Sequence, residues 1–299
     1  AFETESPLKD HLVAEHEAEL QAALGAGPYT CPYGDQEFES LGDLREHIKA
    51  AHLEELLLPS EWDEEVEVAV VGSGFAGLAA AIEAKEAGAD VKIYEKMSRI
   101  GGNSRINGGW LGVVGSDLQE EQGVEDSVER FMDDLLAAGR DLNYPDLVRF
   151  LGECTRPTHQ WTVDHLGVEY QDQLHQLGGH SVFRTLKTKE GSGWGIVRKE
   201  LERVEALGVE IETNASLDEI IKNEEGEVLG IEVREDFEHG TADSGEPTFV
   251  RATKGVVLAT GGFGANVDMR TDQWPSLNED MGTTNQPGTT GEALQDAIQ

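Results

Sequence analysis

Three glycines and an acidic residue with fixed spacing form the clearest chemical pattern of the sequence. Gly72, Gly74 and Gly77 stand in G-x-G-x-x-G spacing in "VVGSGFAGLAAAIEA", after an apolar run typical of a buried strand and at the start of an Ala-rich run typical of a helix. Such glycines permit a tight turn, a close approach of pyrophosphate and close helix–strand packing, and the helix N-terminus then faces the anion. Glu95 ends the next predicted strand, where a carboxylate accepts hydrogen bonds from ribose hydroxyls. The pattern predicts a dinucleotide site without distinguishing FAD from NAD.

A Gly-rich polar segment, "IGGNSRINGG" at residues 100 to 109, follows that strand. It has neither the alternation of a half-buried strand nor the period of a helix, so it predicts a flexible loop. An NAD site does not need such a loop, whereas the extended FAD molecule carries its ribityl chain and ring past the pyrophosphate. Asn103, Ser104 and Asn107 are therefore expected to offer hydrogen bonds to the polar edge of a flavin.

A second pattern lies near the start of the chain, in "YTCPYGDQEFESLGDLREHIKAAH". It fits the C2H2 zinc-finger template C-x2-C-x3-F-x5-L-x2-H-x4-H, except that Gly34 occupies the second cysteine position. The ligands that remain are Cys31, His47 and His52, whereas a closed structural zinc site uses four protein ligands. One interpretation is a degenerate, metal-free remnant of a finger. The other is a zinc ion on three protein ligands, with water or Asp35 as the fourth.

The finger-like unit does not predict DNA binding. The helix positions that would face bases hold Ser40, Asp43 and Glu46, which are neutral or acidic, and there is one such unit. Docking to another protein is the function that we expect of it, if it has one.

The composition is dominated by acidic residues. Asp and Glu number 59 against 23 Lys and Arg, which gives a formal net charge of -36 over 299 residues, spread along the chain. This charge argues against nucleic acid as a partner, because phosphate contacts need Lys and Arg. A diffuse excess of this size is typical of halophilic proteins, in which concentrated salt screens self-repulsion. An ordinary acidic enzyme is the alternative.

The cysteine content and the hydropathy of the sequence indicate the cellular compartment in which the protein is expected. Cys31 and Cys154 are too few for a disulfide framework and suit a reducing cytoplasm, and Cys154 is expected to be a buried small residue. No run of 18 apolar residues and no secretory signal are visible, so we expect no membrane span.

Differences in residue composition and hydrophobic pattern divide the chain into three parts. The predicted parts are an acidic helical segment at 1–27, the finger-like ββα unit at 28–58, and an FAD-binding domain at 59–299. From Val66 strand and helix patterns alternate, which predicts an α/β, Rossmann-like fold with a central parallel sheet. Residues 124–156 and 158–166 are predicted to be helical, and residues 209–235 to form a strand and a β-hairpin.

Four segments carry a family resemblance: "VVGSGFAGLAAAIEA", "EKMSRIGGNSRINGG", "ATGGFGAN" and "TTNQPGTTGEAL", in that order. Together they resemble the FAD-dependent oxidoreductase 2 family, which includes soluble fumarate reductase flavoproteins, urocanate reductase and 3-ketosteroid dehydrogenase. The resemblance runs from about Trp62 to the end of the chain. It implies FAD as the cofactor, held without a covalent bond, because positions 103 to 105 offer no histidine.

The resemblance also implies roles for individual residues. It assigns the pyrophosphate to Gly72, Gly74, Ala76 and Gly77, the adenosine ribose to Glu95 and Lys96, the flavin to Gly102, Asn103, Ser104, Gly108 and Gly109, and the ADP portion to Thr260 and Gly261. Gly291 and Glu292 fall where the family usually has Gly-Asp.

The resemblance further implies hydride transfer between flavin N5 and an activated carbon–carbon double bond of an unsaturated acid or enone. The proton donor and substrate-binding residues are expected beyond residue 299, so the sequence is expected to be part of a longer protein with an unknown electron donor. Within the chain, His180 and Arg184 are the best remaining polar pair for a catalytic role, and packing residues are the alternative interpretation. A non-catalytic FAD-binding or docking protein is the alternative function.

Overall fold

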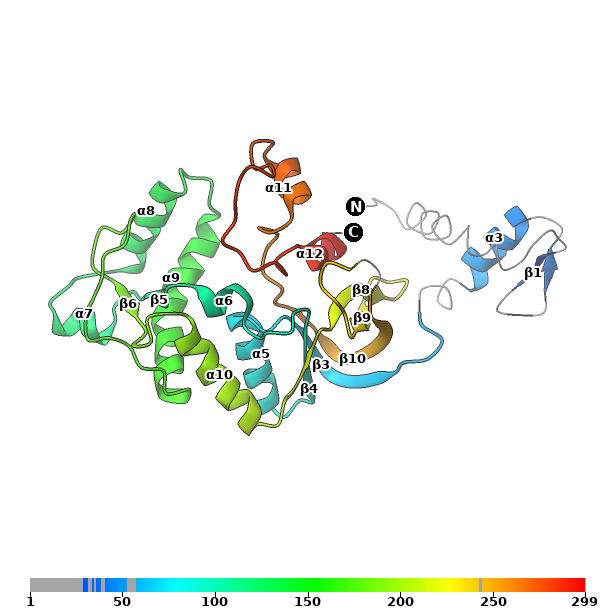
Figure 1. Cartoon of the computed structure of the whole chain (residues 1–299), viewed down its shortest axis with the longest axis horizontal. Coiled ribbons are helices and arrows are strands. Elements are labelled where there is room, and N and C mark those ends of the chain that lie inside the picture. Colours follow the sequence, from blue (N-terminus) through cyan, green and yellow to red (C-terminus); the bar gives the residue numbers. More distant parts are fainter. Residues whose placement is uncertain are drawn as a thin grey trace.

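The computed structural model describes residues 29–31, 34, 36–38, 41–52, 58–241 and 244–298. Figure 1 shows the ββα unit, the mixed sheet with helices beside it, and a lobe of helices formed by the middle of the chain. The predicted acidic helical segment 1–27 lies outside the described residues and stays a prediction.

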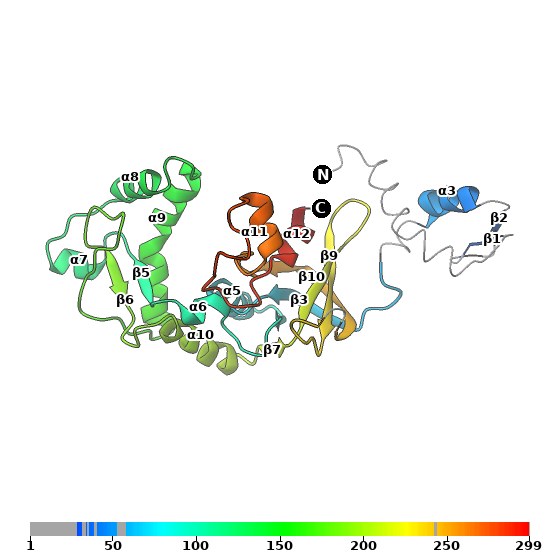
Figure 2. The same cartoon turned by 45° about the horizontal axis from the view of Figure 1, so that its top comes forward.

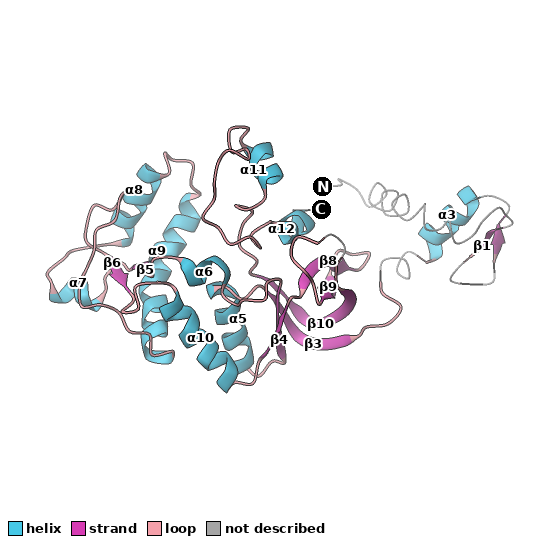
Figure 3. Ribbon diagram, viewed as in Figure 1, coloured by secondary structure: helices cyan, strands magenta, loops and turns pink. Residues whose placement is uncertain are grey.

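A six-stranded mixed sheet forms the centre of the α/β unit (Figure 3). Its order is β7-β4-β3-β10-β9-β8, in which the first four strands run parallel and the last two continue the sheet antiparallel. The strands are β3 (Glu64–Val71), β4 (Val91–Glu95), β7 (Glu210–Thr213), β8 (Ser216–Lys222), β9 (Val228–Glu235) and β10 (Glu246–Leu258). The predicted α/β fold with a parallel sheet and a β-hairpin is confirmed.

Both faces of the parallel strands are covered, as such sheets require. Helices α5 (Phe75–Glu86) and α10 (Trp194–Ala206) pack on one face, where Val70 of β3 joins their apolar cluster. Side chains alternate along a strand, so Ala69 and Val71 instead enter the cluster between the sheet and helix α12 (Glu292–Ile298). The carboxyl ends of β3, β4 and β10 are thereby left as the edge on which a ligand can approach.

A helical lobe, residues 110–187, lies at the left in Figures 1 and 2. It contains α7 (Asp117–Glu121), α8 (Val128–Ala138), α9 (Pro145–Gln160), the π-helical turn η1 (Trp161–His165) and the antiparallel pair β5 (Trp110–Gly112) and β6 (Thr185–Lys187). Two short helices outside the lobe are α6 (Gly102–Ile106) and α11 (Val267–Gln273).

One expectation for this lobe was confirmed in part and another was wrong. The segment 124–156, predicted to be helical, forms α8 and the greater part of α9, which are separated because the chain turns at Gly139, takes positive φ at Arg140 and Asp141, and restarts with Pro145 in the first turn of α9. Cys154 is partly exposed rather than buried.

The ββα unit predicted near the start of the chain is also present. Strands β1 (Tyr29–Thr30) and β2 (Glu37–Phe38) pair antiparallel, and helix α3 (Leu41–Ala51) follows them. Leu44 and Ile48 of α3 are fully buried and form its small core.

Candidate functional site

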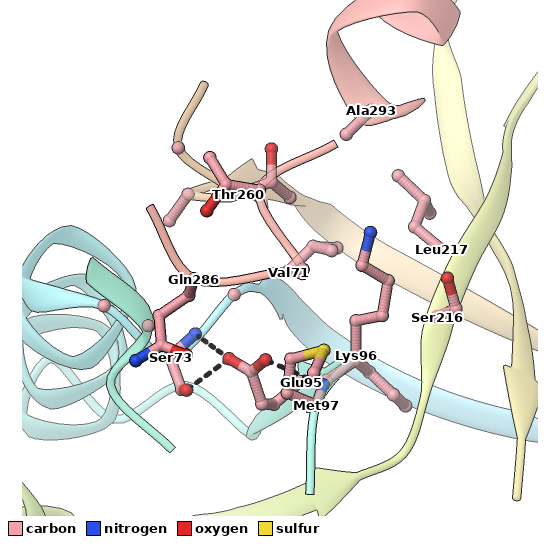
Figure 4. Close-up of a pocket in the computed structure, with 18 of the residues that line it drawn as sticks. Val71, Ser73, Glu95, Lys96, Met97, Ser216, Leu217, Thr260, Gln286 and Ala293 are labelled. Atoms are coloured by element: carbon pink, nitrogen blue, oxygen red, sulfur yellow. Dashed lines mark hydrogen bonds between the residues drawn. The ribbon is translucent and has the colours of Figure 1, made fainter. Parts of the chain in front are cut away.

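A cleft opens at the carboxyl ends of the parallel strands (Figure 4). Ligands of doubly wound sheets bind at this edge. Most of the predicted cofactor residues line it: Gly72, Gly74, Glu95, Lys96, Gly102, Asn103, Ser104, Thr260, Gly261, Gly291 and Glu292. The fold thus brings together residues from both ends of the α/β unit.

In the turn from β3 into α5, a side chain at Gly72 or Gly77 would force the neighbouring backbone to move. Gly72 has a φ of +100°, and a Cβ added there would lie 2.5 Å from the carbonyl oxygen of Ala259. A Cβ on Gly77 would lie 1.9 Å from the carbonyl oxygen of Gly72. Gly77 therefore lets the helix approach the strand, as its spacing predicts, and does not itself line the cleft.

The N-terminus of α5 faces the cleft through Gly74. This residue is the N-cap, and as a glycine it has no side chain of its own that could cap the helix. The amide of Phe75 donates to Ser104 Oγ at 3.0 Å. The first turn of a helix concentrates unpaired amides and the positive end of the helix dipole, so the arrangement suits an anionic group.

Glu95 lies at the base of the cleft, where it is 7% exposed. Its Oε2 accepts hydrogen bonds from the backbone amide of Ser73, at 3.0 Å, and from the Ser73 hydroxyl, and its Oε1 accepts one from the amide of Met97 at 2.9 Å (Figure 4). Ser73 Oγ in turn accepts from the amide of Gly101 at 3.0 Å. These bonds hold the carboxylate in one orientation beside the glycine turn.

Sequence reasoning missed Ser73. It occupies the first variable position of G-x-G-x-x-G, is fully buried, and joins the glycine turn both to Glu95 and to the segment that begins at Gly101. A small hydroxyl residue between two glycines, followed by a strand that ends in an acid, was the signal that could have identified it.

The segment 100–109 differs from the predicted loop, since it contains the short helix α6. Gly101 adopts a φ of +103°, which reverses the chain, and the amide of Arg105 donates to its carbonyl oxygen at 3.0 Å. A helix of five residues is too short to display a helical period, so the pattern could not reveal it.

The polar side chains of this segment have protein partners. Asn103 donates to Asn285 Oδ1 at 2.6 Å and to Thr289 Oγ1 at 3.2 Å, and its Oδ1 accepts from the amide of Gln286 at 2.7 Å. Asn107 bonds to the backbone of its own turn. Their predicted hydrogen bonds to a flavin stay a prediction, while the observed bonds fasten α6 to the segment 285–289.

Lys96 and Glu292 face each other across the cleft. The ammonium of Lys96 donates to the Glu292 carboxylate at 3.0 Å and also to the Thr290 hydroxyl. Burial acts to raise the pKa of Glu292, but hydrogen bonds from Thr290, from its own backbone amide and from Lys96 outweigh it and lower the pKa overall. The longer side chain that stands in place of the family's Asp thus reaches a cation on the opposite wall.

Two of the other predicted cofactor residues, one assigned to the pyrophosphate and one to the flavin, lie at a second cavity of about 670 Å³ between α5, η1, α10 and β5. Ala76 and Gly109 line it, and Gly108 approaches the Trp110 indole so closely that a Cβ would lie 2.6 Å from Nε1. The lining is largely apolar, and its polar members are Glu83, Asn107, Thr158, Thr162 and Glu200. Glu200 is 2% exposed, and burial raises its pKa to about 9.

The two catalytic candidates lie in the helical lobe and do not line the cleft. Arg184 is 0% exposed; it donates to both oxygens of Asp126 at 2.9 and 3.0 Å, and its Nη1 lies 2.9 Å from Asp134 Oδ2 without the geometry of a hydrogen bond. His180 is half-buried, and burial and then the charge of Arg184 lower its pKa. These contacts favour packing roles, and a catalytic role for either residue stays a prediction.

The predicted metal ligands do come together. One ligand atom from each of Cys31, His47 and His52 lies within 4.8 Å of the other two. Asp35, the possible fourth ligand, is outside the described residues. In the part of the chain that the structure describes, no helix has the length and apolar character needed to cross a membrane.

The chain is similar in sequence to proteins that contain an FAD-binding domain. The family model described as "FAD binding domain" matches residues 67–299. The acrylate reductase flavoprotein subunit of Shewanella woodyi is 46% identical over 235 residues, which cover 78% of this chain and 46% of that protein. Urocanate reductase of Eggerthella lenta is 36% identical over 235 residues, or 78% of this chain and 38% of that protein.

A solved structure has the same fold. The open conformation of a flavocytochrome c3 fumarate reductase superposes with a TM-score of 0.72 at 32% sequence identity, over 87% of this chain and 43% of that chain. The chain therefore spans about half the length, or less, of the relatives that it matches.

Proposed function

This chain belongs to the FAD binding domain family, and from that membership we propose that it is the FAD-holding part of a reductase for the carbon–carbon double bond of a small unsaturated acid. FAD is the cofactor of the family. The reaction, the substrate and the electron donor belong to a protein about twice as long as the stretch compared, so they are inferred rather than read from this chain.

The observation that carries the proposal is the cleft at the carboxyl ends of β3, β4 and β10. It combines the N-terminus of α5 at Gly74, which suits a pyrophosphate, with a fixed carboxylate at Glu95, which suits ribose hydroxyls. The absence of side chains at Gly72 and Gly74 leaves the backbone accessible to the anion. The residues present therefore fit the dinucleotide half of FAD.

The remaining assignments follow the family resemblance, and Ala76, Gly77, Gly108 and Gly109 are included on that ground although they do not line the cleft. We assign the pyrophosphate to Gly72, Gly74, Ala76 and Gly77, the ribose to Glu95 and Lys96, the ADP portion to Thr260, Gly261, Gly291 and Glu292, and the flavin to Gly102, Asn103, Ser104, Gly108 and Gly109. Bound FAD supplies two-electron hydride transfer between its N5 and an activated carbon–carbon double bond. The chain's own residues bind and orient it, and the catalytic acid is expected outside residues 1–299.

The substrate class rests on the names of the relatives. Acrylate, urocanate and fumarate reductases are named for acids that share a carboxylate conjugated with a double bond, and the acrylate enzyme's subunit has the highest identity of these. We extend that shared chemistry to this protein: a short acid with a carbon–carbon double bond next to its carboxylate.

The first test is FAD binding by the chain in molar KCl, because the net charge of -36 predicts a need for screening salt. Flavin absorbance that survives desalting, with one FAD per chain, is the expected result. A colourless chain whose tryptophan fluorescence does not change on FAD addition would reject the site assignments.

The second test uses the full-length protein with reduced flavin. Acrylate, fumarate and urocanate are added separately without oxygen, with propionate as a saturated control. We expect at least one unsaturated acid to reoxidise the flavin while propionate does not. Stable FAD binding without reoxidation by any unsaturated acid would favour the non-catalytic FAD-binding alternative.

The domain boundaries within the chain and the cellular location of the protein are also proposals. The division at residues 27 and 58 is supported by the ββα unit that the structure describes between Tyr29 and Ala51. A cytoplasmic location is supported by the two unpaired cysteines.

A further inference from the structure

The ββα unit brings a thiol and two imidazoles to one point. Cys31 follows strand β1, His47 lies on α3, and His52 follows the last turn of that helix, with its amide donating to the carbonyl oxygen of Ile48 at 2.8 Å. One ligand atom from each lies within 4.8 Å of the others. The three side chains come from segments up to 21 positions apart, so the fold of the unit, rather than local sequence, assembles them.

Two of the three groups are poorly explained as ordinary core residues. Cys31 is 3% exposed, and His47 Nε2 is buried with no hydrogen-bond partner. A buried imidazole nitrogen without a partner costs free energy, which binding to a metal ion removes. The His47 ring is also fixed between Phe38 and His52, with ring centroids 4.7 and 4.8 Å away.

The unit has little else to hold it together. Its buried apolar residues among those described are Cys31 and the helix residues Leu44 and Ile48. Units of this size seldom bury enough apolar surface to fold alone and commonly depend on a metal. A bound ion would tie the strand pair to α3 at the end of the helix.

The donor set selects the ion. One thiolate and two imidazoles match the preference of Zn²⁺, with bonds of about 2.0–2.3 Å. Such bonds bring ligand atoms roughly 3.3–3.8 Å apart. The observed separations therefore need only side-chain adjustments of about an ångström.

Gly34 stands where the zinc-finger template has its second cysteine. Its amide donates to the carbonyl oxygen of Cys31 at 3.3 Å. A Cβ added at Gly34 would meet no atom within 4 Å, so a side chain can be introduced at this position without a clash at its Cβ.

We propose that Cys31, His47 and His52 together bind one Zn²⁺. The site is separate from the cleft and does not depend on the function proposed for it. The ion holds the ββα unit together.

The test uses the whole chain, reduced and stripped of metal, in molar KCl to suppress binding to surface carboxylates. Zn²⁺ affinity is measured by competition with a chromophoric chelator, and Co²⁺ is the spectroscopic probe of thiolate ligation. We expect one Zn²⁺ per chain and a thiolate-to-Co²⁺ charge-transfer band. Cys31→Ser should abolish that band, whereas Cys154→Ser should leave it unchanged.

The histidines are tested in the same way. His47→Gln should weaken Zn²⁺ binding at least roughly 10- to 100-fold. A loss of that size follows the removal of a residue that only hydrogen-bonds to a metal ligand, and His47 is itself proposed as a ligand. His239→Gln, at an exposed histidine elsewhere, should leave it unchanged. Gly34→Cys should tighten binding at least about tenfold, because it adds a fourth ligand at a position where a Cβ meets no atom within 4 Å.

Unchanged thermal unfolding of the α/β unit in each variant shows that the rest of the chain is intact. Weak binding of several ions that neither Cys31→Ser nor His47→Gln alters would overturn the proposal. A Co²⁺ band that disappears with Cys154→Ser instead of Cys31→Ser would overturn it as well.

Discussion

The side chains of Asn103 and Asn285 are joined by a hydrogen bond of 2.6 Å although 182 positions separate them in the chain. With the further bonds of Asn103 to Thr289 and Gln286, this contact fastens the short helix α6 to the segment that closes the cleft. Neither segment belongs to the sheet, so these side-chain bonds, together with those from Lys96 to Thr290 and Glu292, align the two walls.

Asn103→Ala should therefore loosen the closing segment. Each lost hydrogen bond contributes about 0.5–1.5 kcal/mol, so FAD affinity should fall roughly 5- to 100-fold. Fluorescence titration measures the affinity, and hydrogen exchange should show faster exchange in residues 283–292. Asn278→Ala, at an asparagine in an exposed turn, is the control that should change neither. Wild-type exchange rates in Asn103→Ala would contradict the alignment role.

Glu95→Gln tests the carboxylate at the base of the cleft. It loses charge-assisted hydrogen bonds from Ser73 and Met97, each contributing about 1.5–3 kcal/mol, and it loses the charge that is expected to face ribose. FAD affinity should fall about 10- to 100-fold in equilibrium titrations. Glu65→Gln, on the exposed side of β3, should bind FAD like the wild type. Equal affinities in the two variants would place ribose elsewhere.

Gly77→Ala tests the close packing of helix α5 on strand β3. Its Cβ would lie 1.9 Å from the Gly72 carbonyl oxygen, so the turn must move. Overpacking of this kind destabilises by about 1–3 kcal/mol, and the displaced turn should lose FAD. Denaturant unfolding and FAD titration measure the two effects. Gly178→Ala, where a Cβ meets nothing within 4 Å, is the matched control. A Gly77→Ala variant with wild-type stability would refute the contact.

Arg184→Met tests whether Arg184 packs or reacts. Removing the guanidinium leaves Asp126 and Asp134 without their buried cation, and breaking such a pair costs about 3–5 kcal/mol. Thermal unfolding should shift down markedly, while the flavin spectrum of the remaining folded protein stays normal. Arg149→Met, in an exposed pair with Glu129, should change stability by less than about 1 kcal/mol. Normal stability with lost turnover in the full-length protein would instead support catalysis by Arg184.

Glu200 should make stability depend on pH. Burial raises its pKa to about 9 in the folded chain, while the unfolded carboxyl ionises near its ordinary value of 4.5. Below that value the proton is bound in both states and the contribution to stability is complete. As the pH rises from 4.5 toward 9, only the unfolded state releases the proton, so stability falls by up to about 1.4 kcal/mol per pH unit.

Glu200→Gln removes that titration. Denaturant unfolding at pH 5.5, 7 and 8.5 should show the variant gaining stability relative to the wild type as the pH rises. The control is Glu202→Gln on the same helix, where the carboxylate is exposed and paired with Lys199 and Arg198. Parallel pH profiles for wild type and Glu200→Gln would show that the buried carboxyl is already ionised.

The sequence predicted those parts of the site that depend on local geometry. The turn at Gly72, Gly74 and Gly77, and the acid that ends β4, follow from spacing within one strand–turn–helix–strand unit. The sheet and its β-hairpin could be anticipated for the same reason, because period and turn residues report local structure directly.

What could not be predicted depends on contacts between distant irregular segments. The bonds from Asn103 to residues 285–289 join two segments without periodicity. The sequence was enough to single out Arg184 as a polar residue. Its partners Asp126 and Asp134 could not be identified from the sequence, because they meet Arg184 only in the folded lobe. Helix α6 escaped detection because a single turn leaves no periodic pattern.

The pairing of Lys96 with Glu292 sets the order of events during synthesis. These residues are 196 positions apart, so a ribosome that makes about 5–20 residues per second needs roughly 10–40 s to pass from one to the other. Through that interval the nascent chain presents the glycine turn and Glu95 without the opposite wall of the cleft. We therefore expect cofactor capture to be a late step of biogenesis, so that limiting the supply of FAD to the cell leaves full-length but unloaded chains rather than arrested ones.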